Sequence, residues 1–129
     1  MNEPKTNLID DVLTIGVPVS DQDRALDFYL EKLGLTKRRD VPVQQIGGRW
    51  IEVASASASV TIALVPARDD VPTGVETGIR LKTRDAAGAH AELQTRGVDV
   101  GELLTWPGVP PMFAIRDQDG NRLEVVEAG

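Results

Sequence analysis

The chain has 129 residues, 41% of them hydrophobic, which suits one globular domain with a real core. Fourteen Lys and Arg against twenty Asp and Glu give a net charge of −6, which argues against nucleic acid or an anionic membrane as a partner. With no cysteine and one histidine, a Cys-ligated metal site and a two-His site within one chain are excluded. No apolar window is long enough for a membrane span or a signal peptide, so we expect a soluble cytoplasmic protein.

The first half of the chain, about residues 12–66, predicts one structural module. Residues 13–19 alternate with period two and predict a strand, after which Asp21 is placed to cap an amphipathic helix. Gly34 suits the left-handed position after the end of that helix. Three further strands are expected over residues 36–41, 49–54 and 59–65, and residues 67–74 are expected to be a linker.

The second half, about residues 75–127, repeats this order. A strand over residues 77–83 is followed by Asp85, 64 residues after Asp21, by a weaker amphipathic helix and by Gly97. Strands are then expected over residues 100–106, 112–116 and 121–127. The sequence therefore predicts an α+β fold in which residues 1–129 form a single domain of two βαβββ modules.

The last hairpin is the most specific local signal in the chain. In RDQDGNRLEVVE the DQDG turn offers Asp side chains to bond the backbone and Gly120 for a positive φ angle. The strand after it carries a carboxylate, Glu124, among apolar residues. That residue is open to three interpretations, as a metal ligand, a binding group or a solvent-facing side chain.

The chain resembles the vicinal oxygen chelate superfamily in its paired βαβββ order and in two motifs, DRALDFYLEKLGL in the first module and DQDGNRLEVVE in the second. This family includes glyoxalase I, extradiol dioxygenases and bleomycin-resistance proteins, and the resemblance covers residues 12–127. It implies curved sheets that form an open cleft with the helices outside. It also implies a homodimer, because members of this fold usually pair and often build clefts from both chains.

The resemblance further implies positions for a metal site. Metal-dependent members hold a divalent ion with two His and one or two Glu, and those positions correspond here to Thr14, Gly78, Ala63 and Glu124. Gly and Ala have no donor atom and a neutral Thr hydroxyl is a poor ligand, so only Glu124 is retained. We therefore predict no bound metal and no cofactor, unless a dimer partner supplies ligands.

Strand alternation predicts which side chains face the cleft. Ile15, Val17, Ile79 and Leu81 are expected to pack under the helices, so the intervening residues face the other way. The predicted ligand-binding cleft, which includes Glu52 as a further candidate, contains Thr14, Gly16, Trp50, Ala63, Gly78, Arg80, Trp106, Met112, Arg122 and Glu124.

Within this set two interpretations stay open. Arg80 and Glu124 could form a buried ion pair of structural importance, or the same pair could fix a polar ligand whose flat body lies against Trp50 or Trp106. The rigid loop TWPGVPPMF, with Met112, could be a binding wall, a subunit contact or a cover for the core. His90 is expected to lie on the helix side as a partly exposed residue rather than a catalytic base.

The resulting functional hypothesis is a metal-free glyoxalase or bleomycin-resistance-like protein. It would bind a small hydrophobic or aromatic molecule for sequestration, resistance or carriage, as a homodimer without nucleic-acid or membrane partners. One alternative is an enzyme of lyase, isomerase or dioxygenase type that uses Glu124 as a base or ligand. Another is a purely structural role with a filled cleft. Classical metal-dependent glyoxalase activity is not expected.

Overall fold

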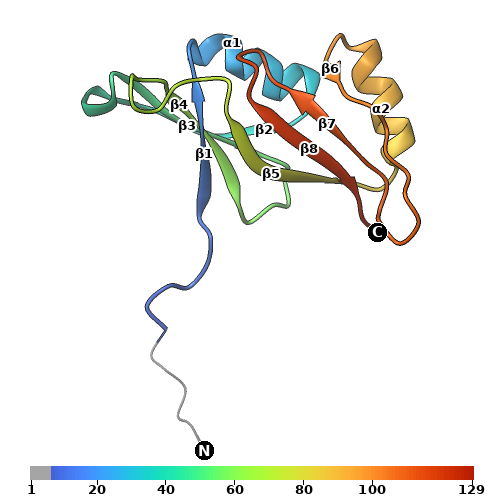
Figure 1. Cartoon of the computed structure of the whole chain (residues 1–129). Helices are drawn as coiled ribbons and strands as arrows, with labels where there is room; N and C mark the ends of the chain where they lie inside the picture. The colour runs from blue at the N-terminus through green and yellow to red at the C-terminus, as the bar shows by residue number, and fades with distance from the viewer. Residues whose placement is uncertain (1–6) are drawn as a thin grey trace, which may run out of the picture.

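The computed structural model describes residues 7–129, and these form two modules of the same βαβββ order (Figure 1). The first module contains β1 (Thr14–Val19), α1 (Gln22–Leu26), the π-helix η1 (Asp27–Lys32), β2 (Thr36–Val43), the 3-10 helix η2 (Gln44–Ile46), β3 (Gly48–Ala54) and β4 (Thr61–Pro66). The second contains β5 (Glu76–Thr83), α2 (Ala86–Thr95), β6 (Asp99–Val100), β7 (Met112–Arg116) and β8 (Arg122–Glu127). The predicted α+β fold is confirmed.

Each module has one four-stranded mixed sheet. The strand orders are β1-β4-β3-β2 and β5-β8-β7-β6, so the first and last strands of each module pair in parallel. In this register Gly16 lies opposite Ala63, and Arg80 lies opposite Glu124. The first strand of each module, β1 or β5, is an edge strand of its sheet. Of the described residues, none belongs to a helix long and apolar enough to cross a membrane.

The predicted helix boundaries are confirmed by their caps. Asp21 accepts hydrogen bonds from the backbone N–H groups of Asp23 and Arg24, and Asp85 accepts one from Gly88. Gly34 and Gly97 adopt φ angles of 76° and 82°, which a residue with a Cβ rarely adopts. These short polar and glycine signals act locally, which is why the sequence predicted them.

The strand expected over residues 100–106 is shorter than predicted. Only Asp99–Val100 forms β6, and Leu104 pairs with Met112 in an isolated bridge. Gly101 also donates its N–H to the carbonyl of Ala114, so the chain stays beside β7 while the regular ladder is interrupted between residues 101 and 104. The prediction was wrong in extent because alternation alone does not reveal such an interruption.

One hydrophobic core is shared by both modules. Val17, Ile51 and Leu64 of the first sheet belong to the same cluster of buried side chains as Phe113 and Leu123 of the second. The helices lie along one side of the molecule and cover the core faces of the sheets (Figure 1). The side chains between these core residues along each strand therefore point to the opposite, uncovered sheet faces.

A buried polar network joins the two modules at the β7–β8 turn. The Asn121 amide donates to the Pro18 carbonyl at 2.8 Å and to the Asp117 carboxylate at 2.9 Å, and its oxygen accepts from the N–H groups of Gly74 and Val75. The Tyr29 hydroxyl donates to the same Asp117 carboxylate at 2.7 Å. Burial, reinforced by Asp117, raises the pKa of Tyr29 far above its usual value, so the phenol remains a donor.

Asn121 is fully buried and uses both ends of its amide. Asn121→Ala should therefore leave the Pro18 carbonyl and the N–H groups of Gly74 and Val75 without these hydrogen-bond partners. We expect a loss of about 2–4 kcal/mol in the free energy of unfolding, measured by urea denaturation. Arg24→Ala, which removes one exposed hydrogen bond to the Gln118 carbonyl of the same turn, should cost less than about 0.5 kcal/mol. Equal effects of the two substitutions would contradict this role for Asn121.

Candidate functional site

The uncovered face of the first sheet carries the predicted cleft residues of that module. Thr14, Gly16 and Ala63 alternate along β1 and β4 with buried core residues, while Trp50 and Glu52 do so along β3. A Cβ built on Gly16 would meet no atom within 4 Å, so the sheet is open above this glycine. Glu52 of β3 lies opposite Ala63 of β4, so the named residues of β1, β3 and β4 share one face of the sheet.

The polar groups of this face form one continuous hydrogen-bonded chain, the Glu52 cluster (Thr14, Trp50, Glu52 and Thr61). The Trp50 indole N–H donates to one Glu52 oxygen at 2.6 Å, and the Thr61 hydroxyl donates to the other at 2.6 Å. The Thr14 and Thr61 hydroxyl oxygens lie 2.8 Å apart, and the Thr14 hydroxyl reaches the Thr61 carbonyl at 3.2 Å. The cluster fixes the orientation of the indole ring.

Hydrogen bonds from Thr61, then from Trp50, hold the pKa of Glu52 below its usual value although partial burial opposes this. Glu52 is therefore an anionic acceptor at neutral pH. Sequence reasoning named Thr14, Trp50 and Glu52 as candidates for this face but missed Thr61. The available signal was that Thr61 precedes Ala63 by two residues on the same strand.

The uncovered face of the second sheet carries a charged set, the Glu124 cluster (Glu76, Arg80, Arg122 and Glu124). Arg122 lies 2.7 Å from Glu76 and 3.3 Å from Glu124, whereas Arg80 approaches Glu124 only to 3.8 Å. The Glu124 side chain is 19% exposed and that of Arg80 is 65% exposed. The expected Arg80–Glu124 ion pair is therefore present, but the expectation that both charges are buried is wrong for Arg80, and Arg122 is the nearer cation.

Gly78 gives the start of β5 an irregular backbone. Its φ angle is 72°, and the register with β8 shifts between Glu76 and Arg80. The Gly78 N–H, followed by Arg122, lowers the pKa of Glu76, and Glu76 followed by Glu124 raises the pKa of Arg122. The bend leaves Gly78 with open space where a Cβ would lie.

The remaining predicted residues occupy separate places. Met112 lies on β7 two residues before Ala114, which is opposite Glu124, so Met112 shares the face of the Glu124 cluster. Trp106 is 59% exposed on the loop between β6 and β7. His90 is partly exposed on α2, where its ring nitrogen lies 2.8 Å from the Gly101 carbonyl and its ring packs edge-on against Phe113.

The two clusters are not joined within one chain. Over residues 7–129, no hydrogen bond or ion pair connects the Glu52 cluster to the Glu124 cluster. Trp50 also lines a small cavity of about 200 Å³, formed with Ile46, Val65, Pro66, Arg68 and Val71 beside the linker. The chain therefore presents two chemically different sheet faces, one polar and aromatic and the other charged.

The residues at the family's metal-ligand positions do not fit a transition metal within one chain. Thr14 offers a neutral hydroxyl already shared with Thr61, Gly78 and Ala63 offer no donor, and Glu124 is engaged by Arg122. Between residues 7 and 129, no group of three His, Cys, Asp or Glu side chains is arranged to hold a metal ion. One carboxylate leaves most of a coordination shell to water, so we derive no chemistry through a metal.

The hydrogen bonds to Glu52 predict a pH-dependent contribution to stability. Because they lower the folded-state pKa of Glu52, their contribution is present above the unfolded-state pKa of about 4.3 and is lost as pH falls through the folded-state value. Thr61→Val should lower the free energy of unfolding by about 1–2 kcal/mol at pH 7, and by less at pH 3.5. Urea denaturation at both pH values, with exposed Thr36→Val as control, measures this. A loss independent of pH would contradict the assignment.

Comparison with solved structures identifies close structural relatives. An antibiotic binding protein, TnmS3 from Streptomyces sp. CB03234, superposes with a TM-score of 0.84 at 34% identity, covering 95% of this chain and 99% of that chain. A glyoxalase/bleomycin resistance protein/dioxygenase superfamily member from Sphaerobacter thermophilus has a TM-score of 0.82 at 33% identity, covering 95% and 100%.

Sequence comparison agrees. The Bacillus subtilis protein YetH is 30% identical over 118 residues, which cover 88% of this chain and 95% of YetH. The family model for the Glyoxalase/Bleomycin resistance protein/Dioxygenase superfamily matches residues 11–125, nearly the whole chain. Its two βαβββ modules and this match show that the chain belongs to the glyoxalase, bleomycin resistance protein and dioxygenase superfamily.

Proposed function

We propose that this protein binds a small apolar or aromatic molecule on its uncovered sheet faces. The carrying observation is the Trp50 indole, held at 2.6 Å by Glu52, which lies opposite the small residue Ala63 in the β3–β4 register. An indole ring that is fixed in this way provides a flat apolar surface at little entropic cost. The charged groups on the second sheet would orient a polar substituent of the ligand.

We propose further that two copies complete the cleft, with the first sheet of one copy facing the second sheet of the other. The lack of polar contacts between the two clusters in one chain supports this, as do the edge strands β1 and β5. The N-terminal arm, residues 8–13, runs away from the body of the molecule (Figure 1) and exposes four large apolar side chains, Leu8 at 88%, Ile9 at 80%, Val12 at 56% and Leu13 at 76%. Such a strip favours burial against a second copy.

The similarity to an antibiotic binding protein supports binding rather than turnover. The donor set at the ligand positions supports a site that works without a metal, because Glu124 alone among them is a strong ligand. The sequestration of a toxic small molecule, or its carriage, is the role that we propose for the cleft. We propose the cytoplasm as its location.

A catalytic role is the second candidate, favoured by Glu124, which is a mostly buried carboxylate between two arginines. In this role Glu124 would accept a proton from a carbon next to a carbonyl of the substrate. Glu124→Gln keeps the shape of the side chain and removes its basicity. Full turnover by this variant would exclude Glu124 as the base.

Tryptophan fluorescence tests the proposed cleft. In a Trp106→Phe background, Trp50 is the only tryptophan, so a flat aromatic ligand that lies against it should quench the emission. We expect at least one of naphthol, naphthalene sulfonate and acridine to quench in a saturable manner. Glu52→Gln, which replaces the anionic acceptor of the indole N–H, should weaken that binding severalfold. Saturable binding of a probe, detected by calorimetry, without any change in Trp50 emission would place the site elsewhere.

The N-terminal arm predicts a concentration-dependent association. The triple variant Leu8→Ser, Ile9→Ser, Val12→Ser removes exposed apolar surface and should shift the equilibrium from dimer to monomer by at least about tenfold in Kd. Sedimentation velocity over a dilution series measures this. Val109→Ser, an exposed apolar residue outside the arm, is the matched control. A wild-type protein that is monomeric at all concentrations would refute the shared cleft.

A further inference from the structure

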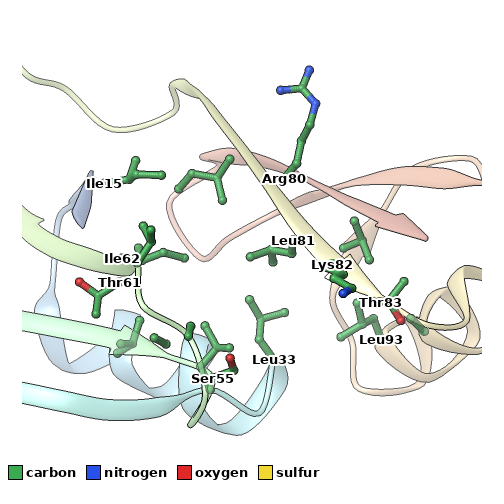
Figure 2. Close-up of a pocket in the computed structure, with 18 of the residues that line it drawn as sticks. Ile15, Leu33, Ser55, Thr61, Ile62, Arg80, Leu81, Lys82, Thr83 and Leu93 are labelled. Atoms are coloured by element: carbon green, nitrogen blue, oxygen red, sulfur yellow. The ribbon is translucent and has the colours of Figure 1, made fainter. Parts of the chain in front are cut away.

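A second cavity lies between the two modules on their helix side, and of the two clusters only Thr61 and Arg80 border it (Figure 2). Its volume is about 590 Å³, within the range of pockets that hold drug-sized molecules. The walls are mainly aliphatic and come from both halves of the chain, including Leu33, Ile62, Leu81 and Leu93. Figure 2 shows Leu33 and Leu81 on opposite sides of the space.

The internal repeat explains why a cavity forms at this place. Tyr29 follows its capping Asp21 by eight residues, and Leu93 follows Asp85 by the same number. Tyr29 bonds Asp117 of the β7–β8 turn, whereas Leu93 has no polar atom and lines the cavity. The polar bridge of one module is therefore replaced by an apolar wall in the other.

The opposing turn differs in the same way. Glu124 and Ala63 occupy matching positions in the two sheets. Asn121 precedes Glu124 by three residues and Val60 precedes Ala63 by three, so Asn121 and Val60 also correspond. Asn121 fills its place with hydrogen bonds to the Pro18 carbonyl and the linker, but Val60 lines the cavity. The turn before Val60 has the sequence SASAS, whereas the corresponding turn of the second module has the sequence DQDGN. The smaller side chains of SASAS leave space where the larger ones of DQDGN do not.

The charges around the cavity are opposite to those of the chain as a whole. The protein has a net charge of −6, but the charged residues that line the cavity are Arg80, Lys82, Arg96 and the single acid Glu92. Arg96 pairs with Glu92 at 3.1 Å, and Arg80 points away from the space in Figure 2. Considering residues 7–129 only, Lys82 has no carboxylate within ion-pair distance, so its ammonium group is available to an anion.

We infer that this cavity is a second binding site, for an amphipathic anion with an aliphatic tail and one carboxylate-type head. The tail lies between Leu33 and Leu93, and the head lies at the open rim of the cavity beside the hydroxyl of Thr83, where the exposed Lys82 reaches it around the edge strand β5. Burial of the tail supplies most of the affinity, and the ammonium group selects the sign of the head. Its lining includes Thr61 and Arg80 of the two clusters but neither Trp50 nor Glu124, so variants of Trp50 and Glu124 separate this site from the proposed cleft.

Calorimetry with the full chain and decanoate, below its micelle concentration, tests the inference. Decyltrimethylammonium has a comparable tail and the opposite charge, and butyrate has the same head and a short tail. We expect decanoate to bind one site per chain and both other compounds to bind at least about tenfold more weakly. Equal affinity for the two long-chain compounds, or no saturable binding of decanoate, overturns the inference.

Three variants locate the site. Lys82→Gln should weaken decanoate binding about fivefold at low salt, with the difference disappearing at 1 M salt, whereas Arg84→Gln, an exposed cation outside the lining, should have no effect. Ala58→Trp should fill the cavity and abolish binding while the melting temperature shows a folded protein. Wild-type affinity in Lys82→Gln or in folded Ala58→Trp overturns the assignment.

A fourth variant separates this inference from the proposed cleft. Trp50→Ala should bind decanoate with wild-type affinity, because Trp50 lies on the uncovered sheet face and does not line this cavity. Loss of decanoate binding in Trp50→Ala would place decanoate in the cleft and overturn the second site. If decanoate fails to bind wild-type protein while an aromatic probe still quenches Trp50, the second site fails and the proposed function stands.

Discussion

The Asn121 side chain holds the two modules and the linker in one arrangement. Its amide donates to the Pro18 carbonyl of β1 and to Asp117, and its oxygen accepts from the N–H groups of Gly74 and Val75. Asp117 extends the network to Tyr29 under the first module's sheet. A fully satisfied buried network of this kind is costly to rearrange, since each broken bond leaves a buried polar group without a partner. The uncovered faces of both sheets depend on it for their orientation.

The repeated modules have diverged in chemistry on both sides of their sheets. On the uncovered side, Glu52 binds an indole and a hydroxyl, whereas Glu124 lies between two arginines. On the helix side, Tyr29 is tied to a polar turn, whereas its counterpart Leu93 lines a cavity. One backbone plan thus produces different surfaces, because main-chain hydrogen bonds set the fold while side chains set what each face can bind.

Much of the fold could be predicted from the sequence, because the relevant signals are local. The caps Asp21 and Asp85, the glycines after each helix and the alternation along the strands each act within a few residues. The DQDG turn was also predicted, but not its function as a bridge. Tyr29 lies 88 residues from its partner Asp117 in this turn, and Pro18 lies 103 residues from its partner Asn121, the residue after the turn, so no local pattern indicates these contacts.

The sequence predicted which sheet face each residue of the candidate site occupies, but not which side chains pair with one another there. Alternation assigned Trp50, Glu52 and Glu124 to uncovered faces, but it could not choose between Arg80 and Arg122 as the nearer cation. That choice depends on side-chain reach across a bulged strand at Gly78. The inter-module cavity was not predicted, because Leu81 and its neighbours have the same pattern whether they close a core or line a space.

A complementation experiment tests the proposed shared cleft most directly. Trp50→Ala damages the first sheet face, and Glu124→Ala damages the second, so neither chain alone should bind an aromatic probe that quenches Trp50 in the parent protein. If the cleft joins sheets from two copies, refolding an equimolar mixture should restore about a quarter of the parental binding sites, because half of the dimers are mixed and each has one intact cleft. A mixture that binds no more probe than the separate variants would contradict the shared cleft.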